Sequence, residues 1–68
     1  MTYLVILERG SNSVGAYVPD LPGCAAVGET HEDALQLIRE AIQLHLEGLR
    51  EQGDAVPEPV SSTVLVEV

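Results

Sequence analysis

The chain has 68 residues, a formal net charge of -8, three arginines, no lysine and a single cysteine. That length leaves room for one domain, residues 1–68, and a fold of this size buries only about 60% of the surface that its unfolded chain exposes. One cysteine forms no disulfide within the chain and suits a reducing compartment, and the negative charge disfavours nucleic acid and anionic membranes as partners. The charge favours a basic partner, or it serves only solubility.

The first ten residues, MTYLVILERG, have no basic segment, and their apolar run is too short for a secretory signal or a membrane span. The sequence therefore predicts a cytoplasmic protein that does not contact a membrane. Residues 2–8 are rich in β-branched and aromatic side chains and predict a strand. The turn formers of residues 10–13 predict a hairpin to a second strand, residues 14–18, and residues 24–27 predict a short third strand.

The end of the second strand and the start of the third are joined through YVPDLPGC, which gathers two prolines, a carboxylate, a glycine and the cysteine. Pro22 presets φ for the second position of a type II turn, and Gly23 accepts the positive φ of the third. Asp20 is expected to bond to nearby backbone N–H groups, as Asx turns do. This rigid turn is either purely structural or presents a surface to a partner, and the candidate residues are Tyr17, Asp20, Leu21, Pro22 and Gly23.

A long amphipathic helix is predicted next. Thr30 is its expected N-cap, with acidic residues in the first turn, and Gly53 is its expected end. The predicted apolar stripe recurs at three- and four-residue spacing: Leu35, Ile38, Ile42, His45 and Leu49. Residues 63–68 then predict a last strand, which the helical crossover permits to lie parallel to a neighbour. The predicted fold class is α+β, a small β-β-β-α-β domain with a three-stranded antiparallel meander, a final strand and one long helix on one face.

Apolar side chains exceed what one helix covers. Residues 3–7 are apolar on both faces of the first strand, and Leu37, Ala41 and Leu44 form a second apolar row on the helix. The surplus predicts a homo-oligomer, a dimer or tetramer, or a face that binds another protein. A self-associating regulatory or small-ligand-binding domain without such a partner is the alternative.

Catalytic and metal-binding patterns are weak. Cys24, His31 and Asp20 supply the residue types of a cysteine hydrolase, but a lone cysteine among small residues is usually a small buried hydrophobe. No metal-ligand spacing occurs, and His31 and His45 lie about 20 Å apart along a helix of 1.5 Å rise per residue. The sequence therefore predicts no catalytic, metal or cofactor site, and no enzyme.

The chain resembles the HicB-like antitoxin family over nearly its whole length, in three ordered motifs. They are a P-D-[LF]-P-G-C turn, a G-[DE]-T-x-[ED]-[ED]-A helix entry and an [IV]-P-x-P segment. The matching positions are Pro19, Asp20, Leu21, Pro22, Gly23 and Cys24; Gly28, Glu29, Thr30, Glu32, Asp33 and Ala34; and Val56, Pro57 and Pro59.

The resemblance implies a fold like a truncated ribonuclease H domain without its metal-binding acids. It also implies the antitoxin role in a type II toxin–antitoxin pair, with a partner that is a small basic RNA-cleaving protein of the HicA type. Many members carry an additional C-terminal DNA-binding domain. These 68 residues include none, so direct DNA binding is not expected of them.

Overall fold

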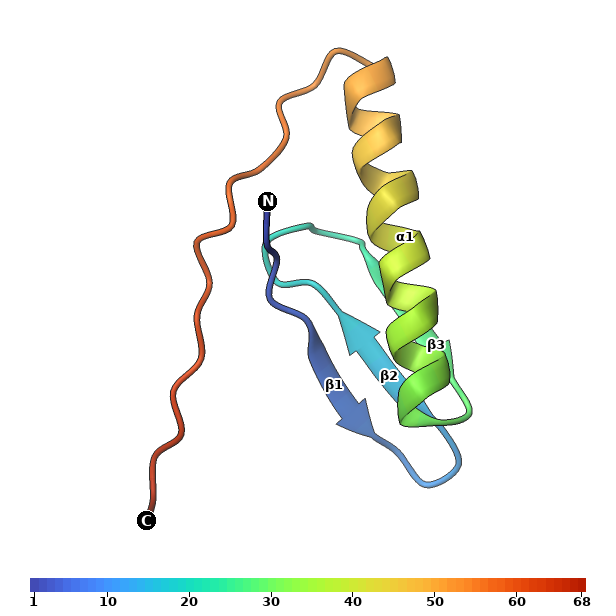
Figure 1. Cartoon of the computed structure of the whole chain (residues 1–68), viewed down its shortest axis with the longest axis vertical. Helices are drawn as coiled ribbons and strands as arrows, with labels where there is room; N and C mark the ends of the chain where they lie inside the picture. The colour runs from blue at the N-terminus through green and yellow to red at the C-terminus, as the bar shows by residue number, and fades with distance from the viewer.

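The structure is a computed structural model that describes all residues, 1–68. Three short strands, β1 (Ile6–Arg9), β2 (Val14–Tyr17) and β3 (Ala25–Gly28), form an antiparallel sheet in the order β1-β2-β3. One helix, α1 (His31–Glu51), lies across one face of this sheet, and an extended tail, residues 55–68, follows it (Figure 1). The predicted meander with one long helix is therefore confirmed.

The β1–β2 hairpin closes through a short turn in which the Gly10 N–H donates to the Ser13 carbonyl at 2.7 Å. The register pairs Arg9 with Val14 and Ile6 with Tyr17. The predicted first strand began at residue 2, whereas β1 begins at Ile6, because β2 ends opposite that residue. The residues before Ile6 therefore have no strand to pair with.

The ends of α1 are those that the sequence predicts. Thr30 is the N-cap, and its side-chain oxygen accepts the Asp33 N–H at 3.1 Å. At the other end Gly53 adopts a φ of 73°, and the Asp54 N–H donates to the Leu49 carbonyl at 2.9 Å. With the Gly53 N–H bonded to the Arg50 carbonyl, this is the Schellman arrangement that glycine favours after a helix.

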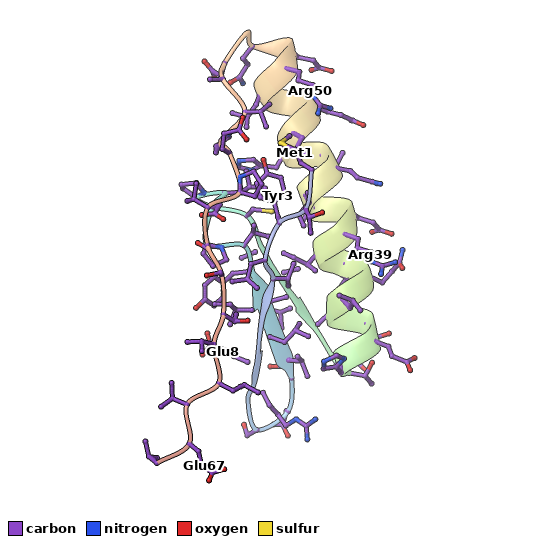
Figure 2. The ribbon with its side chains drawn as sticks, turned by 60° about the vertical axis from the view of Figure 1, so that its left-hand side comes forward. Met1, Tyr3, Glu8, Arg39, Arg50 and Glu67 are labelled. Carbon is purple, nitrogen blue, oxygen red and sulfur yellow. The ribbon has the colours of Figure 1, made fainter.

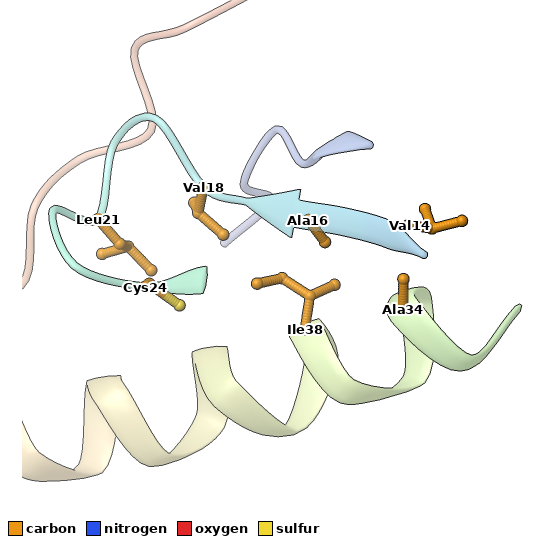
Figure 3. Packing of buried hydrophobic residues seen from close by; sticks show 7 residues of the cluster. All are labelled: Val14, Ala16, Val18, Leu21, Cys24, Ala34 and Ile38. Atoms are coloured by element: carbon orange, nitrogen blue, oxygen red, sulfur yellow. The ribbon is translucent and has the colours of Figure 1, made fainter. Parts of the chain in front are cut away.

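The core is small and lies between β2, the turn after it and the first half of α1 (Figure 3). Ala34 and Ile38 of α1 are fully buried and face β2, and the fully buried Leu21 points from the turn toward α1. The remaining buried apolar side chains are Val14, Ala16, Val18 and Cys24. No helix of the structure is both long and apolar enough to cross a membrane.

The last strand predicted for residues 63–68 is not formed within this chain. Residues 55–68 are extended and pair with no strand. Strand composition is present there, but pairing also needs a sheet edge within hydrogen-bonding distance. The tail leaves the end of α1 and runs apart from β1 (Figure 1), so no edge of its own sheet meets that condition.

Candidate protein-interaction site

The YVPDLPGC segment folds as a closed corner that three backbone hydrogen bonds hold together. The Cys24 N–H donates to the Leu21 carbonyl at 3.0 Å, and Gly23 has a φ of 83°. The Val18 N–H donates to the Cys24 carbonyl at 3.1 Å, which extends the β2–β3 pairing to the base of the corner. The bond and the positive φ are those of a type II turn, so the predicted turn is confirmed.

Within this corner, Leu21 is fully buried and packs in the core. It cannot contact a partner from there. Tyr17 is 39% exposed, and Pro22 and Gly23 are exposed at the tip. Of the five candidate residues, therefore, Tyr17, Asp20, Pro22 and Gly23 lie outside the core and Leu21 does not.

Asp20 binds a segment 40 residues away rather than its own turn. Its carboxylate accepts the Val60 N–H at 3.1 Å, the Ser61 N–H at 3.0 Å and the Ser61 hydroxyl at 2.8 Å. These bonds, those from Ser61 first, lower the pKa of Asp20 below its usual range. The expectation of a local Asx-type bond is wrong, because the adjacent Leu21 N–H already donates to the Val18 carbonyl.

Cys24 lies in the core beside Leu21, with its sulfur on the side that faces α1 (Figure 3). Burial raises the pKa of the Cys24 thiol, which opposes formation of a nucleophilic thiolate. His31 is exposed at the start of α1, and the Asp20 carboxylate is bound to the tail. No three His, Cys, Asp or Glu side chains gather in a way that could hold a metal ion.

A shallow hollow lies between the outer edge of β3 and the first turns of α1. Its apolar part is Val27, which is 67% exposed, and Leu37, which is 40% exposed. Glu29 and Asp33 supply carboxylates at its border. The complete lining of this β3–α1 hollow is Ser13, Val27, Gly28, Glu29, Asp33, Gln36 and Leu37.

Exposed apolar side chains bordered by carboxylates suit a protein partner of basic character, because burial of the apolar area is combined with charge attraction. The sequence marked Leu37 as part of a second apolar row and Glu29 and Asp33 as acids near the helix start. The sequence did not predict that these residues line one hollow together with Val27. Only the packing of α1 against β3 brings them together.

The molecule also has apolar area on the side away from α1. Alternation along β2 directs Val14 and Ala16 toward the helix, so Gly15 and Tyr17 face the other way (Figure 3). No second helix covers that face (Figure 1). Figure 2 shows the side chains of the tail along the outside of the molecule, from the end of α1 to beyond Glu67.

A family model described as HicB-like antitoxin of bacterial toxin–antitoxin system matches residues 3–67. Among solved structures, the chain is similar to the N-terminal domain of the Burkholderia pseudomallei antitoxin HicB, with 37% identity and a TM-score of 0.74. That match covers 85% of this chain and 69% of the other.

Curated relatives are similar over differing lengths. A UPF0150 protein of Thermoplasma acidophilum is 35% identical over 69 residues, covering 97% of each chain. A 14.9 kDa protein of Haemophilus phage HP1 is 34% identical over 58 residues, 85% of this chain. A UPF0150 protein of Helicobacter pylori is 44% identical over 41 residues, 60% of this chain. The chain spans only 44% of the phage protein and 57% of the Helicobacter protein.

Proposed function

Because the chain belongs to the HicB-like antitoxin family, we propose that it acts in the cytoplasm as the antitoxin of a type II toxin–antitoxin pair. Its partner in this proposal is a small basic RNA-cleaving protein of the HicA type, which it binds and occludes. The observation that carries the proposal is the family match over residues 3–67, joined by the similarity to an antitoxin domain at 37% identity. Its role is binding, not catalysis.

The charge of the chain supports a basic partner. Eleven acidic residues against three arginines give the formal net charge of -8. Such a surface accelerates the encounter with a positively charged protein, while burial of apolar area supplies most of the affinity. The β3–α1 hollow has both properties, since Val27 and Leu37 are exposed beside Glu29 and Asp33. We assign the toxin contact to this hollow.

The chemistry of the site supports a binding role in place of an enzymatic one. The cysteine is buried with a raised pKa, and the one carboxylate with a lowered pKa holds the tail of the same chain. Inhibition of a ribonuclease by occlusion requires no reactive group from the antitoxin. It requires only a surface that competes with RNA for the basic site.

The test is to look for a small basic protein encoded beside the chain, to purify the two together, and to measure binding and RNA cleavage. We expect a stable complex, suppression of cleavage at one antitoxin per toxin, and an affinity that falls as salt rises. No complex, or a complex in which cleavage continues at the full rate, would refute the antitoxin function.

Two variants of equal charge change locate the contact. Leu37→Glu places a carboxylate on the part of α1 that lines the hollow, whereas Gln43→Glu adds the same charge at an exposed position of α1 outside it. Leu37→Glu should weaken toxin binding about tenfold or more, since a charge is buried against an apolar contact. Gln43→Glu should leave the affinity nearly unchanged. Equal effects of the two variants would place the contact elsewhere.

A further inference from the structure

One flank of α1 carries a seven-residue repeat. Leu37 and Leu44 lie seven positions apart, and so do Ala41 and Gly48. The spacings between these four positions alternate between four and three residues, which places them in one line along a helix. This line, Leu37, Ala41, Leu44 and Gly48, is called the α1 seam below. Its repeat is the a and d pattern by which one helix packs against another.

The α1 seam is uncovered. Leu37 is 40% exposed and Leu44 is 68% exposed. A Cβ added at Gly48 meets no atom within 4 Å, so no part of this chain packs on that end of the seam. Ala34 continues the repeat toward the start of α1, but it is fully buried where Gly28 of β3 lies against it. The seam is therefore open over three turns, roughly 17 Å at a rise of 1.5 Å per residue.

The core of the domain makes little use of the seam. The fully buried residues of α1, Ala34 and Ile38, lie in its first half, and the helix continues past the strands of the sheet (Figure 1). Further along the helix, Ile42 and Leu46 pack against the core from a neighbouring line, and only Ala41 of the seam joins them. A second apolar line beside the one that serves the core is typical of a helix that packs with a further element.

Carboxylates border the seam with the same seven-residue spacing. Asp33, Glu40 and Glu47 are all exposed, and each precedes a small residue of the repeat. In paired helices this is the g position, whose side chains form ion pairs with the flank of the opposing helix. Glu40 accepts a hydrogen bond from the Gln36 amide at 3.2 Å, and this neutral donor leaves the charge of the carboxylate available. The border of the seam therefore favours a helix with cations at the facing positions.

We propose that an α-helix of the basic toxin packs along the α1 seam and sets lysine or arginine side chains beside Glu40 and Glu47. This inference rests on the proposed antitoxin function and states how the partner is held. The seam is continuous with the β3–α1 hollow, because Leu37 belongs to both. The toxin contact thus begins at the hollow and extends along the uncovered half of α1, as in other complexes in which an amphipathic helix lies on an apolar line.

A second copy of the chain fits the seam less well than a basic helix. Two α1 helices packed antiparallel on their seams would bring Glu40 and Glu47 of one chain beside those of the other. These like charges repel, and each copy carries a formal net charge of -8. A helix with cations on its flank gains attraction at the same positions. Charge complementarity therefore identifies the toxin as the occupant.

The experiment compares toxin binding by the native chain and by two variants of equal charge change. Leu44→Glu places a carboxylate in the middle of the seam and outside the hollow. Gln43→Glu places it one residue earlier, turned away from the seam by about 100° around the helix. Leu44→Glu should weaken binding about tenfold or more, and Gln43→Glu should leave the affinity nearly unchanged. Because both positions are exposed, helix content by circular dichroism should be the same in all three proteins.

A second pair of variants tests the acidic border. Glu47→Lys should weaken binding about tenfold and raise the dissociation rate, because a cation replaces the partner of a cation. Glu58→Lys makes the same change of net charge at an exposed position outside α1, and it should slow association only. Toxin variants in which a single lysine or arginine is changed to glutamate should include one that restores the affinity for Glu47→Lys.

The outcomes separate this inference from the antitoxin function. A toxin that is inhibited by the native chain and binds Leu44→Glu equally well overturns the helix contact and leaves the antitoxin function standing. A native chain that binds no basic protein overturns both. Sedimentation of the chain without toxin provides the remaining outcome: a change of oligomeric state in Leu44→Glu identifies a second copy as the occupant of the seam and overturns the proposal.

Discussion

Gly28→Ala tests the closest contact between the sheet and the helix. A Cβ added at Gly28 would lie 2.5 Å from the Ala34 nitrogen, 2.9 Å from the Ala34 Cα and 2.9 Å from the Asp33 carbonyl carbon. Optimal separations of non-bonded heavy atoms are about 3.5–4.0 Å, so the start of α1 must move away from β3 by roughly 1 Å. All three atoms belong to the backbone, and no side-chain rotation relieves the contact.

Overpacking of this kind costs about 1–3 kcal/mol, and the reduced freedom of the unfolded chain returns about 0.4–1 kcal/mol. The rigid backbone contact and the buried neighbours Ala34 and Ile38 favour the upper part of that range. We expect a net loss of about 2 kcal/mol in the free energy of unfolding. In a domain of this size that lowers the Tm by roughly 8–16 °C.

The assay is urea and thermal unfolding of both proteins at the same chain concentration, because association shifts apparent stability. Gly48→Ala is the matched control. Its Cβ meets nothing within 4 Å, and alanine in a helix interior is favoured by about 0.8–1 kcal/mol over glycine. Gly28→Ala that is as stable as the native chain, or that gains stability as Gly48→Ala should, would refute the tight packing of α1 on β3.

Three other perturbations have expected outcomes. Gly23→Ala puts a Cβ at a backbone φ of 83°, with no other atom within 4 Å of it. Thermal unfolding should therefore show a free energy of unfolding lower by about 1–2 kcal/mol from backbone strain alone, and an unchanged Tm would contradict that strain. Ile38→Ala empties a fully buried site and should lower the free energy of unfolding in urea by about 2–5 kcal/mol. Leu44→Ala, at a position 68% exposed, should lower it little, and similar losses in the two variants would contradict the placement of Ile38 in the core. The Asp20 carboxylate, whose pKa is lowered, holds the tail fully above the usual pKa of about 3.9 and releases it as pH falls through the lower folded value. The tail amides should then shift in NMR spectra only in acid, and an Asp20→Asn variant that shows the same acid transition would refute the assignment.

Local features of the sequence were sufficient for the strongest predictions. Pro22 and Gly23 determine a type II turn by their own φ preferences, and Thr30 and Gly53 delimit the helix by capping. Each of these signals acts within four or five residues. Their outcome therefore depends little on how the rest of the chain packs, and the structure contains all of them.

Long-range contacts were not predictable in the same way. The residues around Asp20 are typical of a local turn, yet its carboxylate accepts hydrogen bonds from residues 60 and 61. Packing brings the tail to this carboxylate, while the adjacent Leu21 N–H already donates to the Val18 carbonyl. The β3–α1 hollow combines Val27 and Leu37, and no spacing in the sequence relates these two positions.

By itself, then, the sequence determined an α+β fold with a meander and a capped helix, since periodicity and turn chemistry are local properties. It also determined the acidic charge and the family. Only the tertiary structure decided which apolar side chains are covered and which are left exposed. It buried Leu21, exposed Val27, and left the strand-forming residues 63–68 without a partner, because pairing and burial depend on which surfaces the fold brings together.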